Sequence, residues 1–167
     1  MWYNSIKGDA MSTAVILAGG ESRRMRRDKL TLRFGKQTLL ESAVDRFSRY
    51  FDTVWVSVAD SEKYAGVPAR RIADIYAGCG PIGGLHAALL NTSDEGVFLV
   101  AADMPFADPE AAKRIMELAG DCDISLTVDR RSRYEPLFAY YRKTVSEQVE
   151  AAVLSGEYKI AALAPKV

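Results

Sequence analysis

Short apolar runs alternate along this chain with stretches in which apolar residues recur every three or four positions. The short runs predict β-strands, and the periodic stretches predict helices with one buried face. Pro109 and Asp108 strengthen one helix start, because proline suits the first helical position and aspartate is a favoured N-cap. The predicted strands are residues 14–18, 53–58, 71–73, 97–101, 124–128 and 137–141, and the predicted helices are 39–50, 81–91, 110–119 and 145–154.

The order of these elements is mostly strand, helix, strand. Such an order predicts an α/β fold in which a largely parallel sheet has helices on both faces. In open sheets of this kind, ligands bind in the crevice beyond the carboxyl ends of the strands. We therefore expect the functional residues directly after strands.

Composition limits the protein to one compact unit. The chain has 167 residues, of which 49% are hydrophobic, enough for one core and too few residues for two ordinary domains. We expect a single domain at residues 12–167, preceded by a disordered leader at 1–11 without periodicity.

Charge and cysteine content exclude several classes of function. The 22 basic residues equal the 22 acidic ones, so we expect no nucleic-acid or membrane partner. Neither a membrane-spanning apolar run nor the apolar core of a signal peptide is present, which favours the cytoplasm. Cys79 and Cys122 form no metal-binding motif and fit a reducing compartment.

The segment after the first predicted strand has the chemistry of a phosphate-binding loop. Gly19 and Gly20 stand where the chain must turn, and glycine lets backbone amides approach an anion closely. The loop matches neither the Walker A pattern nor the dinucleotide fingerprint. A dense basic run follows the glycines: Arg23, Arg24, Arg26, Arg27, Lys29, Arg33 and Lys36.

The order LAGGESRRM followed by Asp28-Lys29 resembles the signature of the molybdenum cofactor guanylyltransferase family. Further matching motifs follow along the chain: Asp74, the segment GPIGGL from Gly80, the segment DMPF from Asp103, and the segment EPL from Glu135. The resemblance covers about residues 13–142. It implies a three-layer, Rossmann-like nucleotidyltransferase fold with a mostly parallel central sheet.

The resemblance also implies a reaction and its catalytic residues. Family members transfer GMP from GTP to molybdopterin or the molybdenum cofactor and release pyrophosphate. Because two anions must meet, the main task is charge neutralisation and alignment. Arg24 is expected to bind the leaving phosphates and Lys29 the α-phosphate region, and Asp103 is the expected ligand of Mg²⁺.

The remaining roles also follow from the resemblance. Other proteins of molybdoenzyme maturation are implied as partners besides GTP and the acceptor. Nucleotide binding is assigned to Leu17, Ala18, Gly19, Gly20, Lys29, Ser57, Asp74 and Asp103, and acceptor binding to Gly80, Gly84 and Glu135.

Three departures from the family pattern keep alternatives open. Ser57 stands where relatives commonly have Asn, and Arg26 where they usually have Gly. Relatives also carry an Asn-containing segment after the last helix, so we expect that this chain lacks the C-terminal segment. The alternatives are a cytidylyl- or sugar-phosphate nucleotidyltransferase of the same fold, and a nucleotide-binding module with little or no turnover.

Overall fold

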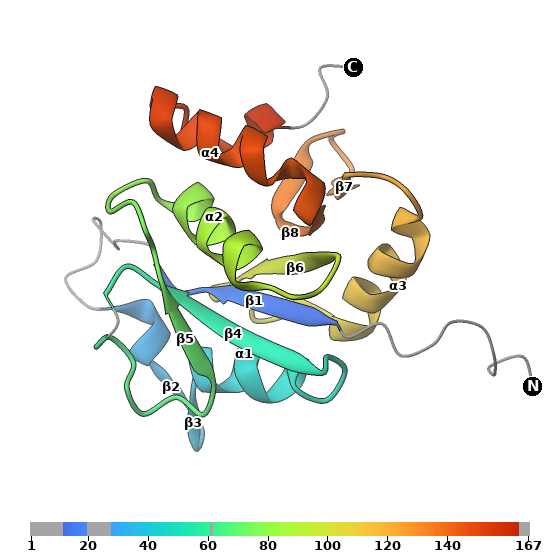
Figure 1. Ribbon diagram of the computed structural model, residues 1–167. Helices are drawn as coiled ribbons and strands as arrows, with labels where there is room; N and C mark the ends of the chain where they lie inside the picture. Colours follow the sequence, from blue (N-terminus) through green and yellow to red (C-terminus); the bar gives the residue numbers. More distant parts are fainter. Residues whose placement is uncertain (1–11, 20–27, 61, 164–167) are drawn as a thin grey trace, which may run out of the picture.

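The computed structural model describes residues 12–19, 28–60 and 62–163 (Figure 1). The expected leader at 1–11, most of the basic loop and the last four residues lie outside the described part.

A six-stranded sheet forms the centre of the molecule, in the order β5-β4-β1-β6-β8-β7. β1 pairs in parallel with β4 and β6, and β4 pairs in parallel with β5. β8 runs antiparallel to both β6 and β7. The prediction of a mostly parallel sheet is confirmed. The strands are β1 (Thr13–Leu17), β4 (Thr53–Val58), β5 (Arg70–Ala73), β6 (Gly96–Ala101), β7 (Ile124–Val128) and β8 (Tyr134–Arg142).

Helices cover both faces of this sheet, which gives the predicted three layers. α1 (Leu39–Phe47) and α3 (Pro109–Ala119) bury apolar side chains in the same cluster on one face. α2 (Pro81–Asn91) and α4 (Ser146–Ser155) pack over the other face. Figure 1 shows α2 and α4 above the strands and α1 below them. No helix among the described residues has the length and apolar character needed to cross a membrane.

Local sequence explains where these helices begin. Thr38 and Glu41 form a capping box at α1, in which each side chain accepts a hydrogen bond from the other residue's backbone N–H. Asp108 caps α3 as predicted, accepting from the Glu110 N–H. α2 begins differently: Gly80 has φ +67° and no side-chain cap.

Apart from one-residue shifts at element ends and short 3₁₀ helices, the structure differs from the predicted elements in three places. The helix predicted at 39–50 ends at Phe47, because the next residues form tighter turns in which Arg49 N donates to Arg46 O and Tyr50 N to Phe47 O. The strand predicted at 137–141 extends to Tyr134–Arg142, since pairing with β7 continues beyond the apolar run. A short hairpin of β2 (Arg33–Phe34) and β3 (Gln37–Thr38) was not predicted, and Gly35 turns it with φ +65°.

Candidate functional site

The carboxyl ends of the parallel strands lie level at one edge of the sheet. Leu17 at the end of β1 is paired with Ser57 of β4 and with Ala101 of β6. The pairing continues past the strands, because Ala18 N donates to Ser57 O at 2.8 Å and Ala102 N donates to Leu17 O at 3.1 Å. Since β4 and β6 lie on opposite sides of β1, this edge is the switch point where ligands bind in open α/β sheets.

Most of the residues predicted for the site fall at this edge or next to it. Gly20 and Arg24 lie outside the described residues, so their roles stay predictions. The predicted residues that the structure describes are Leu17, Ala18, Gly19, Lys29, Ser57, Asp74, Gly80, Gly84, Asp103 and Glu135.

Ser57 and Asp74 form a polar pair beside the end of β1. Ser57 is buried, and its Oγ donates to Asp74 Oδ1 at 3.3 Å. Gly84 of α2 packs against this pair: a Cβ there would lie 2.4 Å from Ser57 Oγ and 2.6 Å from Leu17 Cδ2. The missing side chain therefore lets α2 approach the sheet. The structure groups Gly84 with residues predicted for nucleotide binding, and its predicted acceptor contact stays untested.

The carboxyl group of Asp74 is partly shielded from solvent. Burial raises its pKa to about 6, against a smaller lowering by the hydrogen bond from Ser57. A carboxylate with this pKa is mostly ionised at neutral pH and can then only accept hydrogen bonds. Asp74 is thus suited to bind N–H or O–H donors of a ligand.

The Asp74 pKa predicts a pH dependence of stability. Folded Asp74 keeps its proton up to about pH 6, whereas the unfolded chain loses it near the ordinary value of 3.8. The free energy of unfolding should therefore fall as pH rises through this interval, by about 1 kcal/mol after allowance for partial solvent screening. Urea unfolding of the wild type and of Asp74→Asn, at pH 3.8 and at about pH 6, measures this change in the free energy of unfolding.

The variant Asp74→Asn should lose this contribution to the pH slope. The fully exposed Asp121→Asn serves as the control and should keep it. A wild-type slope equal to that of Asp74→Asn would contradict the assignment.

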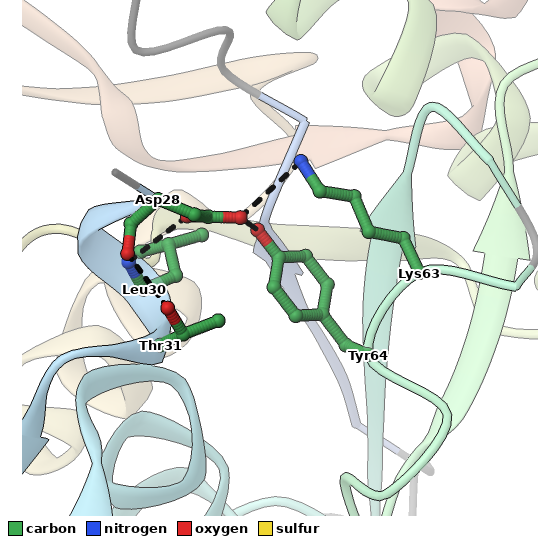
Figure 2. A network of polar contacts seen from close by, with 5 residues as sticks. All are labelled: Asp28, Leu30, Thr31, Lys63 and Tyr64. Carbon is green, nitrogen blue, oxygen red and sulfur yellow. Dashed lines mark hydrogen bonds and ion pairs between the residues drawn. The ribbon is translucent and has the colours of Figure 1, made fainter. Parts of the chain in front are cut away.

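Asp28 ties the segment after the basic loop to the segment after β4 (Figure 2). Its Oδ2 accepts from Tyr64 Oη at 2.5 Å and lies 3.3 Å from Lys63 Nζ, and its Oδ1 accepts from Leu30 N at 3.1 Å. Burial acts to raise the pKa of Asp28, but these donors lower it overall. Lys29 follows Asp28 and begins a 3₁₀ helix, Lys29–Thr31, so this network fixes the backbone of the predicted catalytic lysine.

Tyr64 has φ +59°, in the left-handed region that non-glycine residues rarely adopt. Such a conformation costs about 1–3 kcal/mol and persists where surrounding contacts hold it. The hydrogen bond to Asp28 is such a contact. Sequence reasoning missed it, because a polar pair 36 residues apart leaves no periodic signal.

We expect Tyr64→Phe to destabilise the fold by about 1 kcal/mol, because Asp28 loses one of its donors. The melting temperature should fall by about 3 °C for a domain of this size. Thermal unfolding followed by circular dichroism measures it. Tyr50→Phe, at an exposed tyrosine, is the matched control, and equal melting of the two variants would argue against the network.

Asp103 follows β6 and its side chain is exposed. No group of three or more His, Cys, Asp or Glu suited to a metal occurs among the described residues. Asp103 would supply one oxygen ligand. One carboxylate fits Mg²⁺, which binds proteins through few carboxylates and completes its octahedron with substrate phosphates and water.

A pocket of about 580 Å³ opens beside Asp103. Residues after β6 form one side, and Glu135 and Phe138 of β8 form the other. The predicted acceptor residues are thus divided: Glu135 lies with Asp103, whereas Gly80 begins the helix that packs against Ser57.

Arg46 of α1 holds the loop that forms the first side of this pocket. Its Nη1 donates to Pro105 O at 2.5 Å and to Ala107 O at 3.0 Å, and its Nη2 donates to Met104 O at 3.3 Å. One planar guanidinium therefore fixes three neighbouring carbonyls. Sequence reasoning missed this arginine, because its partners are backbone atoms about 60 residues away.

Comparison with known proteins places this geometry among nucleotidyltransferases. Residues 14–165 match the family model described as MobA-like NTP transferase domain. A "probable molybdenum cofactor guanylyltransferase" of Pelotomaculum thermopropionicum is 34% identical over 157 residues, which cover 93% of this chain and 76% of that protein.

Solved structures give the same picture. The crystal structure of molybdopterin-guanine dinucleotide biosynthesis protein A from Archaeoglobus fulgidus superposes with a TM-score of 0.77 at 26% identity, covering 90% of this chain and 77% of that one. The 2-C-methyl-D-erythritol 4-phosphate cytidylyltransferase of Thermus thermophilus reaches 0.61 at 17% identity, covering 92% and 85%. At that identity the likeness concerns the fold alone.

Proposed function

Because the chain belongs to the MobA-like NTP transferase family, we propose that it transfers GMP from GTP to molybdopterin or the molybdenum cofactor and releases pyrophosphate. The observation that carries this proposal is the common edge of the sheet. Gly19, the Ser57–Asp74 pair and Asp103 all lie at this edge, where the carboxyl ends of the parallel strands are aligned. A nucleotide across this edge would have its base near Asp74 and its phosphates near Asp103.

Ionised Asp74 favours guanine over cytosine. The guanine edge offers adjacent N–H donors, which one carboxylate can accept together, whereas the cytosine edge offers one donor beside an acceptor. The hydroxyl of Ser57 points to Asp74 and orients this carboxylate. This chemistry supports the guanylyl proposal over the cytidylyl alternative.

The reaction itself requires two anions to approach. An oxygen of the acceptor's terminal phosphate attacks the α-phosphorus of GTP, and the bond to the β-phosphate breaks as pyrophosphate leaves. Lys29, fixed by Asp28, and Arg24 would neutralise the phosphates. Asp103 would hold Mg²⁺, which supplies positive charge to the reacting oxygens.

Two measurements test the proposal. Thermal melting with Mg²⁺ and each of GTP, CTP, UTP and ATP should show the largest stabilisation with GTP. Equal protection by all four would contradict guanine recognition. Release of pyrophosphate from GTP with molybdopterin present tests transfer, and GTP binding without release would instead support a binding module.

A further inference from the structure

We infer that the pocket beside Asp103 binds the pterin ring system of the acceptor, with Phe106 as the stacking face. The inference rests on the proposed function, because it concerns the acceptor of that reaction. Phe106 and Phe138 had no predicted role, and Glu135 was expected near the pterin of the acceptor.

The first support is an exposed aromatic ring on a fixed backbone. The side chain of Phe106 is 95% exposed, although water around a phenyl ring is unfavourable. The carbonyls on both sides of Phe106 accept hydrogen bonds from Arg46, so the backbone that carries the ring is held at the rim of the pocket. Because the backbone is already ordered, stacking on a flat partner costs only the side-chain freedom of Phe106.

The second support is the opposite wall. The ring of Phe138 packs edge-to-face on buried Phe98, with centroids 4.9 Å apart and an interplanar angle of 79°. Phe138 is therefore a rigid apolar surface. The pocket volume of about 580 Å³ falls within the range of small-molecule sites, and its mainly apolar wall suits an aromatic heterocycle.

Charge orients the acceptor in this pocket. Asp103, Glu135 and the α3 cap Asp108 all line it, and three carboxylates repel a phosphate group. The acceptor's phosphate would therefore lie at Asp103 only where Mg²⁺ neutralises it, and the pterin would extend toward Glu135. One oxygen of Glu135 already accepts from Leu137 N at 3.2 Å, but a carboxylate has further lone pairs for the amino and ring N–H donors of a pterin.

Phe106→Ala tests the stacking face. The KM for molybdopterin should rise about three- to tenfold, while kcat and the Kd for GTP stay unchanged. Phe106→Tyr should restore the wild-type KM, because it keeps the ring. Leu118→Ala removes another exposed apolar side chain, 74% exposed on α3, and should behave as wild type. An unchanged KM in Phe106→Ala would overturn the inference.

Arg46→Lys tests the fixed loop, because an ammonium group cannot reproduce the planar fork. Its KM for molybdopterin should also rise, and adding Phe106→Ala should bring little further change, since Arg46 acts through the same ring. Full additivity of the two changes would overturn the positioning role of Arg46.

A measurement without turnover separates this inference from the proposed function. Hydroxymethylpterin fluorescence should be quenched by the wild type and by Phe106→Tyr, and less by Phe106→Ala, in the absence of GTP. Quenching without pyrophosphate release would retain the pocket and reject the transferase. Pyrophosphate release with the same KM for molybdopterin in the wild type and in Phe106→Ala would support the transferase and reject the pterin pocket.

Discussion

Asp103→Asn should lower kcat by about 10²- to 10³-fold, the largest effect expected in this protein. Asparagine keeps the shape of the side chain but presents a neutral oxygen to the metal. The described residues contain no group of three or more His, Cys, Asp or Glu placed to hold a metal ion without it. Pyrophosphate release at saturating GTP and molybdopterin measures the change, and the protection of the fold by GTP should lose its dependence on Mg²⁺.

Asp60→Asn provides the matched control for Asp103. Asp60 also follows a parallel strand, β4, and its carboxylate accepts from Glu62 N in a surface turn. Asparagine can retain that bond, so turnover should stay near the wild-type value. A loss in Asp103→Asn no larger than in this control would remove Asp103 from the metal site.

Gly84→Ala should destabilise the protein by about 1–3 kcal/mol, although the same change in an ordinary helix interior stabilises by about 1 kcal/mol. The added Cβ would meet Ser57 Oγ at 2.4 Å and Leu17 Cδ2 at 2.6 Å, so α2 must move away from β1 and β4. This movement also displaces Asp74, and GTP affinity should fall together with stability. Urea unfolding and titration with GTP measure the two effects.

The neighbouring variant Gly83→Ala is the control. It shows whether the loss of stability comes from the clash at Gly84 or from any alanine placed in this part of α2. Its Cβ would lie 3.3 Å from Asp74 Oδ2 and from Cys79 Cβ, contacts that small shifts can relieve. We expect a nearly neutral effect on stability. Ser57→Ala combined with Gly84→Ala should recover part of the loss, since it removes the closest atom. A stabilising Gly84→Ala would show that α2 does not depend on the close approach.

The sequence predicted the sheet edge well because buried elements follow hydrophobic patterns. The bounds of β4 and α2 agree with the prediction, as both are mainly apolar runs that are buried almost continuously. The parallel order then predicted that residues at the carboxyl ends of the strands would gather at one edge, as Ser57 near the end of β4 and Asp74 after β5 do.

The contacts that position individual side chains could not be predicted in the same way. Tyr64 reaches Asp28, and Arg46 reaches the loop before Phe106, across long separations and without any periodic pattern. The hairpin of β2 and β3 has only two residues in each strand, too few for alternation to appear. Such polar pairings depend on the three-dimensional path of the chain, which local propensity does not specify.

The strand order also has a consequence for synthesis on the ribosome. In the sheet, β8 lies between β6 and β7, so β7 is connected to the other strands only through β8. Yet β7 is translated before β8. The β7 segment therefore has no neighbour in the sheet until Tyr134–Arg142 has emerged, whereas β1 can pair with Thr53–Val58 first and gains its second neighbour only with Gly96–Ala101. Because non-local pairings of this kind are slow and leave strand edges open, the nascent chain depends on its last third to close the sheet.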